Sequence, residues 1–217
     1  MMQKPSKFPN DSLGKLSLKV QACTLCKLSK TRINSVAGEG SSSSKVMFIG
    51  EAPGSHEDSE GRPFVGYAGR ILDAALHKAG IRRSEIFITN VVKCRPPNNR
   101  RPENDEISAC RRHLEKQISL LSPKIICILG STAYRSILGG KSIIADRGRI
   151  VEKEGKIFFL TVHPASVRYN RSLYSALEKD LSTLAKKIHE PGLPRKNTIR
   201  RMKRFAVSKK RFSKRIN

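Results

Sequence analysis

The sequence contains no apolar run long enough to span a bilayer. Residues 1–20 lack the compact apolar segment and cleavage site of a secretory signal, and Asp11 argues against a transit peptide. The apolar content is ordinary for a globular protein and allows a real core. We therefore expect a soluble intracellular protein without membrane association, in which 217 residues form one domain plus an extension.

Acidic residues are scarce, with 18 Asp and Glu against 43 Lys and Arg and a formal net charge of +25. This imbalance indicates a polyanionic partner, usually nucleic acid, although a merely soluble basic protein is the alternative. The segment 191–217 contains eleven Lys and Arg and no acidic residue. Its composition predicts a disordered arm that adds salt-sensitive phosphate contacts to a folded domain at 1–190.

Two common chemical motifs are missing. The phosphate-binding pattern G-x-x-x-x-G-K-[ST] is not present, because the Ser-rich segment 38–45 has no second glycine in the required place. The metal-dependent hydrolase pattern H-E-x-x-H is not present either. Neither nucleoside triphosphate binding nor hydrolysis of that metal-dependent kind is supported.

Apolar runs predict four buried strands, at 45–49, 86–91, 124–129 and 157–162. Helical patterns follow at 68–79, 102–121, 131–138 and 172–188, and a minor hairpin is expected at 143–151. Alternating strands and helices predict an α/β protein with a parallel sheet that helices cover on both faces. Right-handed crossovers are the default for such a sheet.

Five cysteines are present, namely Cys23, Cys26, Cys94, Cys110 and Cys127. In an intracellular protein, a C-x2-C pair with two later cysteines favours a zinc or iron–sulfur centre over disulfides. A zinc ribbon would normally have a second close C-x2-C pair, and unrelated buried thiols are the alternative to a metal site. Cys127 lies inside an apolar strand and is expected to be a plain core residue.

Informative side chains stand where the predicted strands end: Glu51 after the first, Asn90 at the second and His163 after the fourth. The carboxyl ends of parallel strands meet at one edge, so we expect these residues to share a pocket with the loop 50–54 and Phe64. Asn90 matches a pyrimidine edge, His163 can donate to a ring oxygen, and Phe64 can stack on the ring. Taken singly, each residue also has a structural interpretation as a turn, cap or core residue.

Three segments resemble motifs of the family 4 uracil-DNA glycosylases: GEAPG at 50–54 with GRPFVG at 61–66, TNVVKCRPPNNR at 89–100, and TVHPAS at 161–166. They agree in order and spacing, and the likeness covers residues 20–190. The resemblance implies a three-layer α/β/α fold with a central four-stranded parallel sheet. It also implies a structural [4Fe–4S] cluster rather than zinc, held by Cys23, Cys26, Cys94 and Cys110.

The implied reaction is hydrolysis of the N-glycosidic bond of deoxyuridine in single- or double-stranded DNA, the first step of base-excision repair. The base must leave the stack to be read. By motif, Phe64 stacks on uracil, Asn90 reads N3–H and O4, and His163 donates to O2 as the uracil anion forms. The implied catalytic residues are Glu51, Asn90 and His163, and the implied uracil-binding residues are Gly50, Glu51, Ala52, Gly54, Phe64, Asn90 and His163. The expected enzyme is monomeric, cytoplasmic, nucleoid-associated and bacterial.

Three implied roles stay open for Glu51: orienting water, stabilising the sugar cation, or excluding the methyl group of thymine. The loop after the last motif is expected to enter the minor groove and fill the space left by the base. Val167, Arg168 and Tyr169 are the candidate wedges, and Arg171 is a further candidate DNA contact. No insert of the kind that forms a covalent DNA adduct follows the second motif, so ordinary turnover is expected. A catalytically inactive iron–sulfur or zinc module that binds nucleic acid with the same fold is the alternative function.

Overall fold

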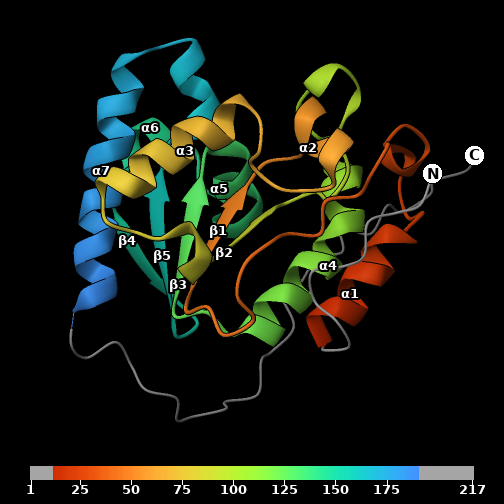
Figure 1. The fold of residues 1–217 in the computed structure, drawn as a ribbon, viewed down its shortest axis with the longest axis horizontal. Helices are drawn as coiled ribbons and strands as arrows, with labels where there is room; N and C mark the ends of the chain where they lie inside the picture. Colours follow the sequence, from red (N-terminus) through yellow and green to blue (C-terminus); the bar gives the residue numbers. More distant parts are fainter. Residues whose placement is uncertain (1–11, 191–217) are drawn as a thin grey trace, which may run out of the picture.

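The computed structural model describes residues 12–190, so the predicted arm at 191–217 lies outside the described residues (Figure 1). The α-helices are α1 Ser12–Gln21, α2 Ser55–Glu60, α3 Tyr67–Lys78, α4 Asn104–Leu121, α5 Ser131–Leu138, α6 Ile143–Asp146 and α7 Ser172–His189. The strands are β1 Val46–Gly50, β2 Ile86–Asn90, β3 Ile125–Leu129, β4 Ile150–Lys153 and β5 Lys156–Thr161. Short 3-10 helices span Lys27–Lys30 (η1), Arg83–Glu85 (η2), Pro97–Asn99 (η3) and Pro164–Arg168 (η4).

The strands form one sheet in the order β2-β1-β3-β5-β4. The four predicted strands pair in parallel, which confirms the predicted parallel sheet, and β4 adds an antiparallel fifth strand at the edge. Every residue of β1, β2 and β3 is buried, as expected for strands that are covered on both faces. The apolar runs in the sequence are continuous because both faces of these strands are buried.

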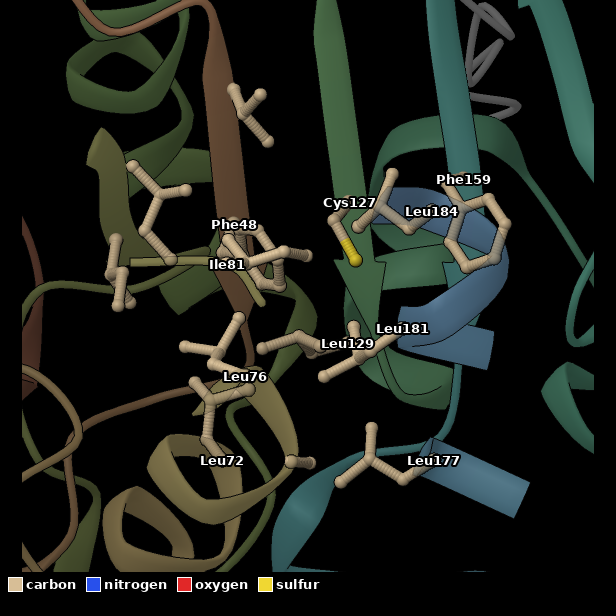
Figure 2. Close-up of a cluster of buried hydrophobic side chains, with 14 of the residues drawn as sticks. Phe48, Leu72, Leu76, Ile81, Cys127, Leu129, Phe159, Leu177, Leu181 and Leu184 are labelled. Carbon is tan, nitrogen blue, oxygen red and sulfur yellow. The ribbon is translucent and has the colours of Figure 1, made fainter. Parts of the chain in front are cut away.

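Two helical layers cover the sheet, so the predicted α/β/α architecture is confirmed (Figure 1). Along β1, Phe48 packs in the cluster with α3 and α7, whereas Met47 and Ile49 pack in the cluster with α1, α4 and α5. Figure 2 shows the first cluster, where Leu76 of α3 and Leu181 of α7 lie near Leu129 of β3. This packing fixes the carboxyl ends of the strands, where the predicted site residues lie.

Some predicted boundaries differ from the structure. The helix predicted at 102–121 begins at Asn104, because Glu106 accepts a hydrogen bond from the N–H of Glu103 and so caps the first turn. The hairpin predicted at 143–151 is wrong in detail: its first residues form α6, and the true hairpin joins β4 to β5. No helix within residues 12–190 is both long and apolar enough to cross a membrane.

Candidate active site

The carboxyl ends of β1, β2 and β5 meet at one edge of the sheet. Because Gly50 pairs with Asn90 in parallel register, Glu51 begins its loop directly beside the end of β2. His163 follows the last residue of β5 by two positions. A cavity of about 560 Å³ opens at this edge, and the predicted residues in its lining are Glu51, Ala52, Gly54, Phe64, Asn90 and His163. The structure thus brings together residues that are more than 100 positions apart in the sequence.

Glycines make room for the functional side chains. A Cβ atom on Gly50 would lie 2.5 Å from Asn90 Oδ1 and 2.7 Å from Phe64 Cζ. A Cβ atom on Gly130, at the end of β3, would lie 2.7 Å from His163 Cβ. Gly50, a predicted uracil-binding residue, is not in the cavity lining, but its lack of a side chain allows Asn90 and Phe64 to converge.

Two buried polar atoms at this edge lack hydrogen-bond partners. Among the described residues, neither Asn90 Oδ1 nor His163 Nε2 has a partner, although both residues line the cavity. A buried polar group without a partner costs about 1–3 kcal/mol, so native proteins rarely leave one without a purpose. These two atoms are the natural contacts for a polar ligand in the cavity.

His163 is arranged as a neutral hydrogen-bond donor. Its Nδ1 accepts a hydrogen bond of 3.2 Å from the N–H of Ala165, so the ring proton belongs on Nε2, which has no protein partner in the described region. Burial lowers the pKa of His163, while the charges of Glu51 and Glu57 act in the opposite direction. The side chain therefore offers an Nε2–H to the cavity without a positive charge.

Phe64 lies beside His163, with ring centroids 5.7 Å apart and the ring planes tilted by 32°. Its backbone has a positive φ of 51°, which is strained for a residue with a bulky side chain. The buried carboxylate of Glu57 fixes this loop, because it accepts hydrogen bonds from the N–H groups of Val65 (2.9 Å), Gly66 (2.8 Å) and Gly54 (3.1 Å). Both loops that shape the cavity are thus joined to one carboxylate.

Sequence reasoning assigned no role to Glu57. The sequence signal that could have indicated a capping role for Glu57 is its position three residues after Gly54, at the start of a short helix.

The carboxylate of Glu51 accepts a hydrogen bond from the hydroxyl of Thr132, which is buried at the start of α5. This contact joins residues 81 positions apart, so no local pattern could have indicated it. Glu51 is therefore held in a defined position on the cavity wall, with its second oxygen free of this bond.

The rim of the cavity is basic and carries one prominent aromatic side chain. Arg100, Arg101, Arg168 and Tyr169 line it, and Tyr169 is 88% exposed. Val167 is only 5% exposed and packs inward, whereas Arg171 is exposed just beyond the rim. Of the predicted DNA-contacting residues, Arg168 and Tyr169 lie at the cavity, and Val167 does not face solvent.

The four predicted cluster ligands converge on a second, smaller pocket. Cys23, Cys26, Cys94 and Cys110 all line it, from three segments of the chain, and all are free thiols. N–H groups point at the sulfurs: Arg32 donates to Cys94 Sγ at 2.9 Å, and the backbone of Lys93 donates to Cys110 Sγ at 3.2 Å. His113 Nε2 lies 3.3 Å from Cys23 Sγ.

No group of three or more His, Cys, Asp or Glu residues in the described region is arranged to hold a single metal ion. Cys127 is fully buried in β3 and packs in the core, as predicted.

Lys93 lies between the two sites and is 1% exposed. Its ammonium group donates to Thr89 Oγ1 (2.6 Å), to the backbone oxygen of Asn90 (2.7 Å) and to Gln117 Oε1 (2.7 Å). Burial lowers the pKa of Lys93 to about 8, and the neighbouring thiols of Cys110 and Cys94 counteract that effect. Sequence reasoning overlooked this residue, although a lysine inside the apolar run VVKC was a visible anomaly.

Comparison with known proteins agrees with the site. Residues 37–186 match the model of the uracil DNA glycosylase superfamily. The type-4 uracil-DNA glycosylase of Sulfurisphaera tokodaii is 48% identical over 201 residues, covering 87% of this chain and 89% of the relative. The type-4 enzyme of Saccharolobus solfataricus is 45% identical over 180 residues, covering 78% of this chain and 83% of the relative.

A third relative gives the same result. The type-4 uracil-DNA glycosylase of Thermotoga maritima is 45% identical over 160 residues, covering 72% of this chain and 83% of the relative. The matched segment includes the loops and strand ends that form the cavity, because the superfamily model spans residues 37–186. The chain therefore belongs to the uracil DNA glycosylase superfamily and, within it, to the family 4 enzymes.

Proposed function

We propose that this chain hydrolyses the N-glycosidic bond of deoxyuridine in DNA, releases uracil and leaves an abasic site, and so starts base-excision repair. One observation carries the proposal: Asn90 Oδ1 and His163 Nε2 are buried without partners in the described region and line one cavity beside Phe64. Uracil supplies the matching groups, an N3–H for the amide oxygen and an O2 for the imidazole N–H. The relatives are named for activity on uracil in DNA, which supports the same conclusion.

Recognition requires the base to leave the helix and enter the cavity. Phe64 stacks on the ring face, and Asn90 accepts from N3–H while its amide N–H donates to O4. Cytosine presents an acceptor at N3 and a donor at the neighbouring position, so it opposes Asn90 at both contacts. Asn90 therefore selects uracil over cytosine, the normal base from which it differs by deamination.

Bond breaking separates charge between the sugar and the base. The electron pair of the C1′–N1 bond leaves with uracil, whose O2 gains negative charge and accepts the Nε2–H of His163. Water adds to C1′, and one of its protons ends on the released base. Glu51 holds this water, and its negative carboxylate stabilises the positive charge that develops on the deoxyribose. The hydrogen bond from Thr132 keeps the Glu51 side chain in place.

The basic rim binds the DNA strand. Arg168 and Arg101 contact phosphates, and Arg171 adds a contact beyond the cavity, whereas the guanidinium of Arg100 is paired with Glu106. Tyr169 is the wedge that fills the space left by the base, because it is far more exposed (88%) than Tyr67 (38%), the other tyrosine that lines the cavity. The buried Val167 supports this loop from below.

The donor set of the second pocket fits a [4Fe–4S] cluster. Four thiols converge from three segments, and N–H groups approach the sulfurs, as is typical of thiolate-ligated clusters. A cluster spreads its four thiolates around several iron atoms, which suits a pocket that has no arrangement for one ion in the described region. When bound, it joins the N-terminal segment to α4 and to the loop after β2; its role is structural.

The cofactor has its own test. Anaerobically purified protein should be brown, with broad visible absorption and iron bound to the four cysteines. Stoichiometric zinc in a colourless protein would contradict the cluster. The monomeric state, the cytoplasmic and nucleoid-associated location, the bacterial origin and the domain limit at residue 190 remain predictions.

The activity is tested with oligonucleotides that contain one uracil, in single- and double-stranded form. The wild type should release uracil and create alkali-labile sites, whereas Phe64→Ala should lower turnover and keep the cluster spectrum. Affinity for DNA without release of any base would instead support a catalytically inactive binding module.

A further inference from the structure

Lys93 is a buried cation that has no carboxylate partner among the described residues. Its three hydrogen bonds go to a hydroxyl, a backbone carbonyl and a side-chain amide, all of which are neutral. Hydrogen bonds that a buried ammonium group donates to neutral acceptors reduce the free-energy cost of burying its charge, but they do not remove that cost. Buried charges in proteins are normally paired, so Lys93 requires a counter-charge from another source.

The cysteines beside Lys93 supply negative charge once they bind a cluster as thiolates. Lys93 lines their pocket, its backbone N–H donates to Cys110 Sγ, and Cys94 is the next residue in the chain. Thiolates that hold a cluster are permanently deprotonated and therefore supply the missing counter-charge.

The same ammonium group holds the uracil-reading residue. Lys93 Nζ donates to the backbone oxygen of Asn90 at 2.7 Å, at the end of β2 where the Asn90 side chain enters the cavity. Thr89 and Gln117 complete the shell around Nζ and leave it no freedom to turn away. Loss of this hydrogen bond would leave the backbone oxygen of Asn90 without its Lys93 donor, at the position from which the uracil-reading side chain extends.

We propose that Lys93 is the positioning residue that joins the two sites: its charge is balanced by the thiolate-bound cluster, and its hydrogen bond sets the backbone of Asn90 for uracil recognition. The inference rests on the proposed function, because it concerns the reading of uracil by Asn90. It assigns the cluster a local electrostatic role in the active site, in addition to joining segments of the chain.

Lys93→Met removes the charge and the hydrogen bonds and keeps the length of the side chain. Arg32→Met is the matched control, because Arg32 also donates to a cluster cysteine, Cys94, but its other hydrogen bond goes to the backbone oxygen of Gln21 and not to Asn90. Gln117→Met leaves the charge of Lys93 in place and removes one acceptor from its shell, together with the hydrogen bond that Gln117 accepts from Thr89 and the one that it donates to the backbone oxygen of Ala37.

Two measurements are made on each cluster-loaded protein: the reduction potential of the cluster by voltammetry, and the inhibition constant of free uracil. Lys93→Met should lower the potential, since a nearby positive charge favours the reduced cluster, and should raise the inhibition constant about tenfold, the cost of one lost charged hydrogen bond. Arg32→Met should lower the potential and leave the inhibition constant at the wild-type value. Gln117→Met should raise the inhibition constant and leave the potential unchanged.

A Lys93→Met protein with an unchanged potential or an unchanged inhibition constant overturns the proposal. If Lys93→Met does not fold, the test passes to Gln117→Met. An unchanged inhibition constant of uracil in Gln117→Met would then overturn the proposal. Failure of the proposed function is recognised separately, because wild-type protein would then neither release uracil nor be inhibited by it, while the potentials would still respond to Lys93 and Arg32.

Discussion

A single hydrogen bond determines the chemistry of His163. The N–H of Ala165 occupies Nδ1, which leaves Nε2 as the donor that faces the cavity. Protonation would place a hydrogen on Nδ1 against the N–H of Ala165 and would break that contact. The neutral form is therefore the one that fits both the loop and a substrate oxygen.

This arrangement predicts the pH dependence of the reaction. Burial holds the pKa of His163 below its ordinary value of 6.5, so the active neutral form persists as pH falls to 6.5 and is lost only below it. A plot of kcat/KM against pH should be flat just above 6.5 and should fall on the acidic side. In His163→Gln the rate should be lower and this acidic limb should disappear. An acidic limb with a midpoint above 6.5 would contradict the assignment.

The free energy of unfolding should also depend on the protonation of His163. Because the folded state has the lower pKa, the unfolded state binds the extra proton first, and stability is lost as pH falls below 6.5. Chemical denaturation of wild type and His163→Gln on both sides of pH 6.5 checks this sign, since the variant lacks this contribution.

Thr132 provides the residue-scale test of Glu51. Thr132→Val keeps the shape of the side chain and removes the hydroxyl that donates to Glu51. We expect the single-turnover rate to fall about tenfold, the cost of one charged hydrogen bond, while the inhibition constant of free uracil stays constant. Ser131→Ala, at the exposed neighbouring position of α5, is the control and should match the wild type. A loss of uracil affinity with an unchanged rate would show that Glu51 acts in binding instead.

At the scale of elements, the six-residue helix α2 joins three separate segments. Glu57 holds the loops on either side of the cavity, and the next residue, Asp58, accepts from the N–H groups of Ile33 (3.0 Å) and Asn34 (3.2 Å). Ile33 and Asn34 follow the segment that contains Cys23 and Cys26. A helix too short to be stable alone is thus fixed by its two carboxylates.

Glu57→Gln tests this bridge. The amide has one acceptor oxygen where the carboxylate has two, so at least one of the N–H groups of Gly54, Val65 and Gly66 loses its partner. The free energy of unfolding should fall by about 1–3 kcal/mol, and the inhibition constant of uracil should rise because Phe64 is released. Glu60→Gln, exposed on the same helix, should change neither quantity. Equal effects of the two substitutions would rule out the bridge.

The elements that could be predicted from sequence are those with a local physical signature. Parallel strands buried on both faces give continuous apolar runs, and α5 ends at Gly139 because glycine adopts the φ of +72° found there. By contrast, β4 was assigned incorrectly, because it is a partly exposed edge strand with the charged residues Glu152 and Lys153. The short helix α2 also has no apolar periodicity to reveal it.

The candidate site divides in the same way. Asn90, His163 and Glu51 follow apolar strands directly, so parallel topology alone predicts that they meet. Thr132 and Lys93 act through contacts with residues that are distant in sequence or on another element, and only the folded structure reveals these contacts. The sequence therefore predicts the side chains that line the cavity, but it does not reveal the residues that position those side chains through hydrogen bonds.

At the scale of the whole molecule, the net charge of +25 suits a polyanionic substrate. The segment 191–217, outside the described residues, supplies eleven of the basic residues. Removing it should weaken binding to DNA at low salt and should reduce the slope of log K against log salt, because fewer counterions are released. The rate of uracil release at saturating DNA should not change. A salt slope identical to that of the full chain would show that the segment does not contact DNA.

The central claim is that the cavity at the carboxyl edge of the sheet reads and releases uracil through Asn90 and His163. The most direct measurement is the amount of free base that the cluster-loaded protein releases from matched oligonucleotides containing uracil or cytosine at one position. We expect uracil to be released and cytosine to be retained, with single-turnover rates about 10²- to 10³-fold lower in Asn90→Ala and in His163→Ala. Release of uracil at wild-type rates by both variants, or no release by the folded wild type, would contradict the account.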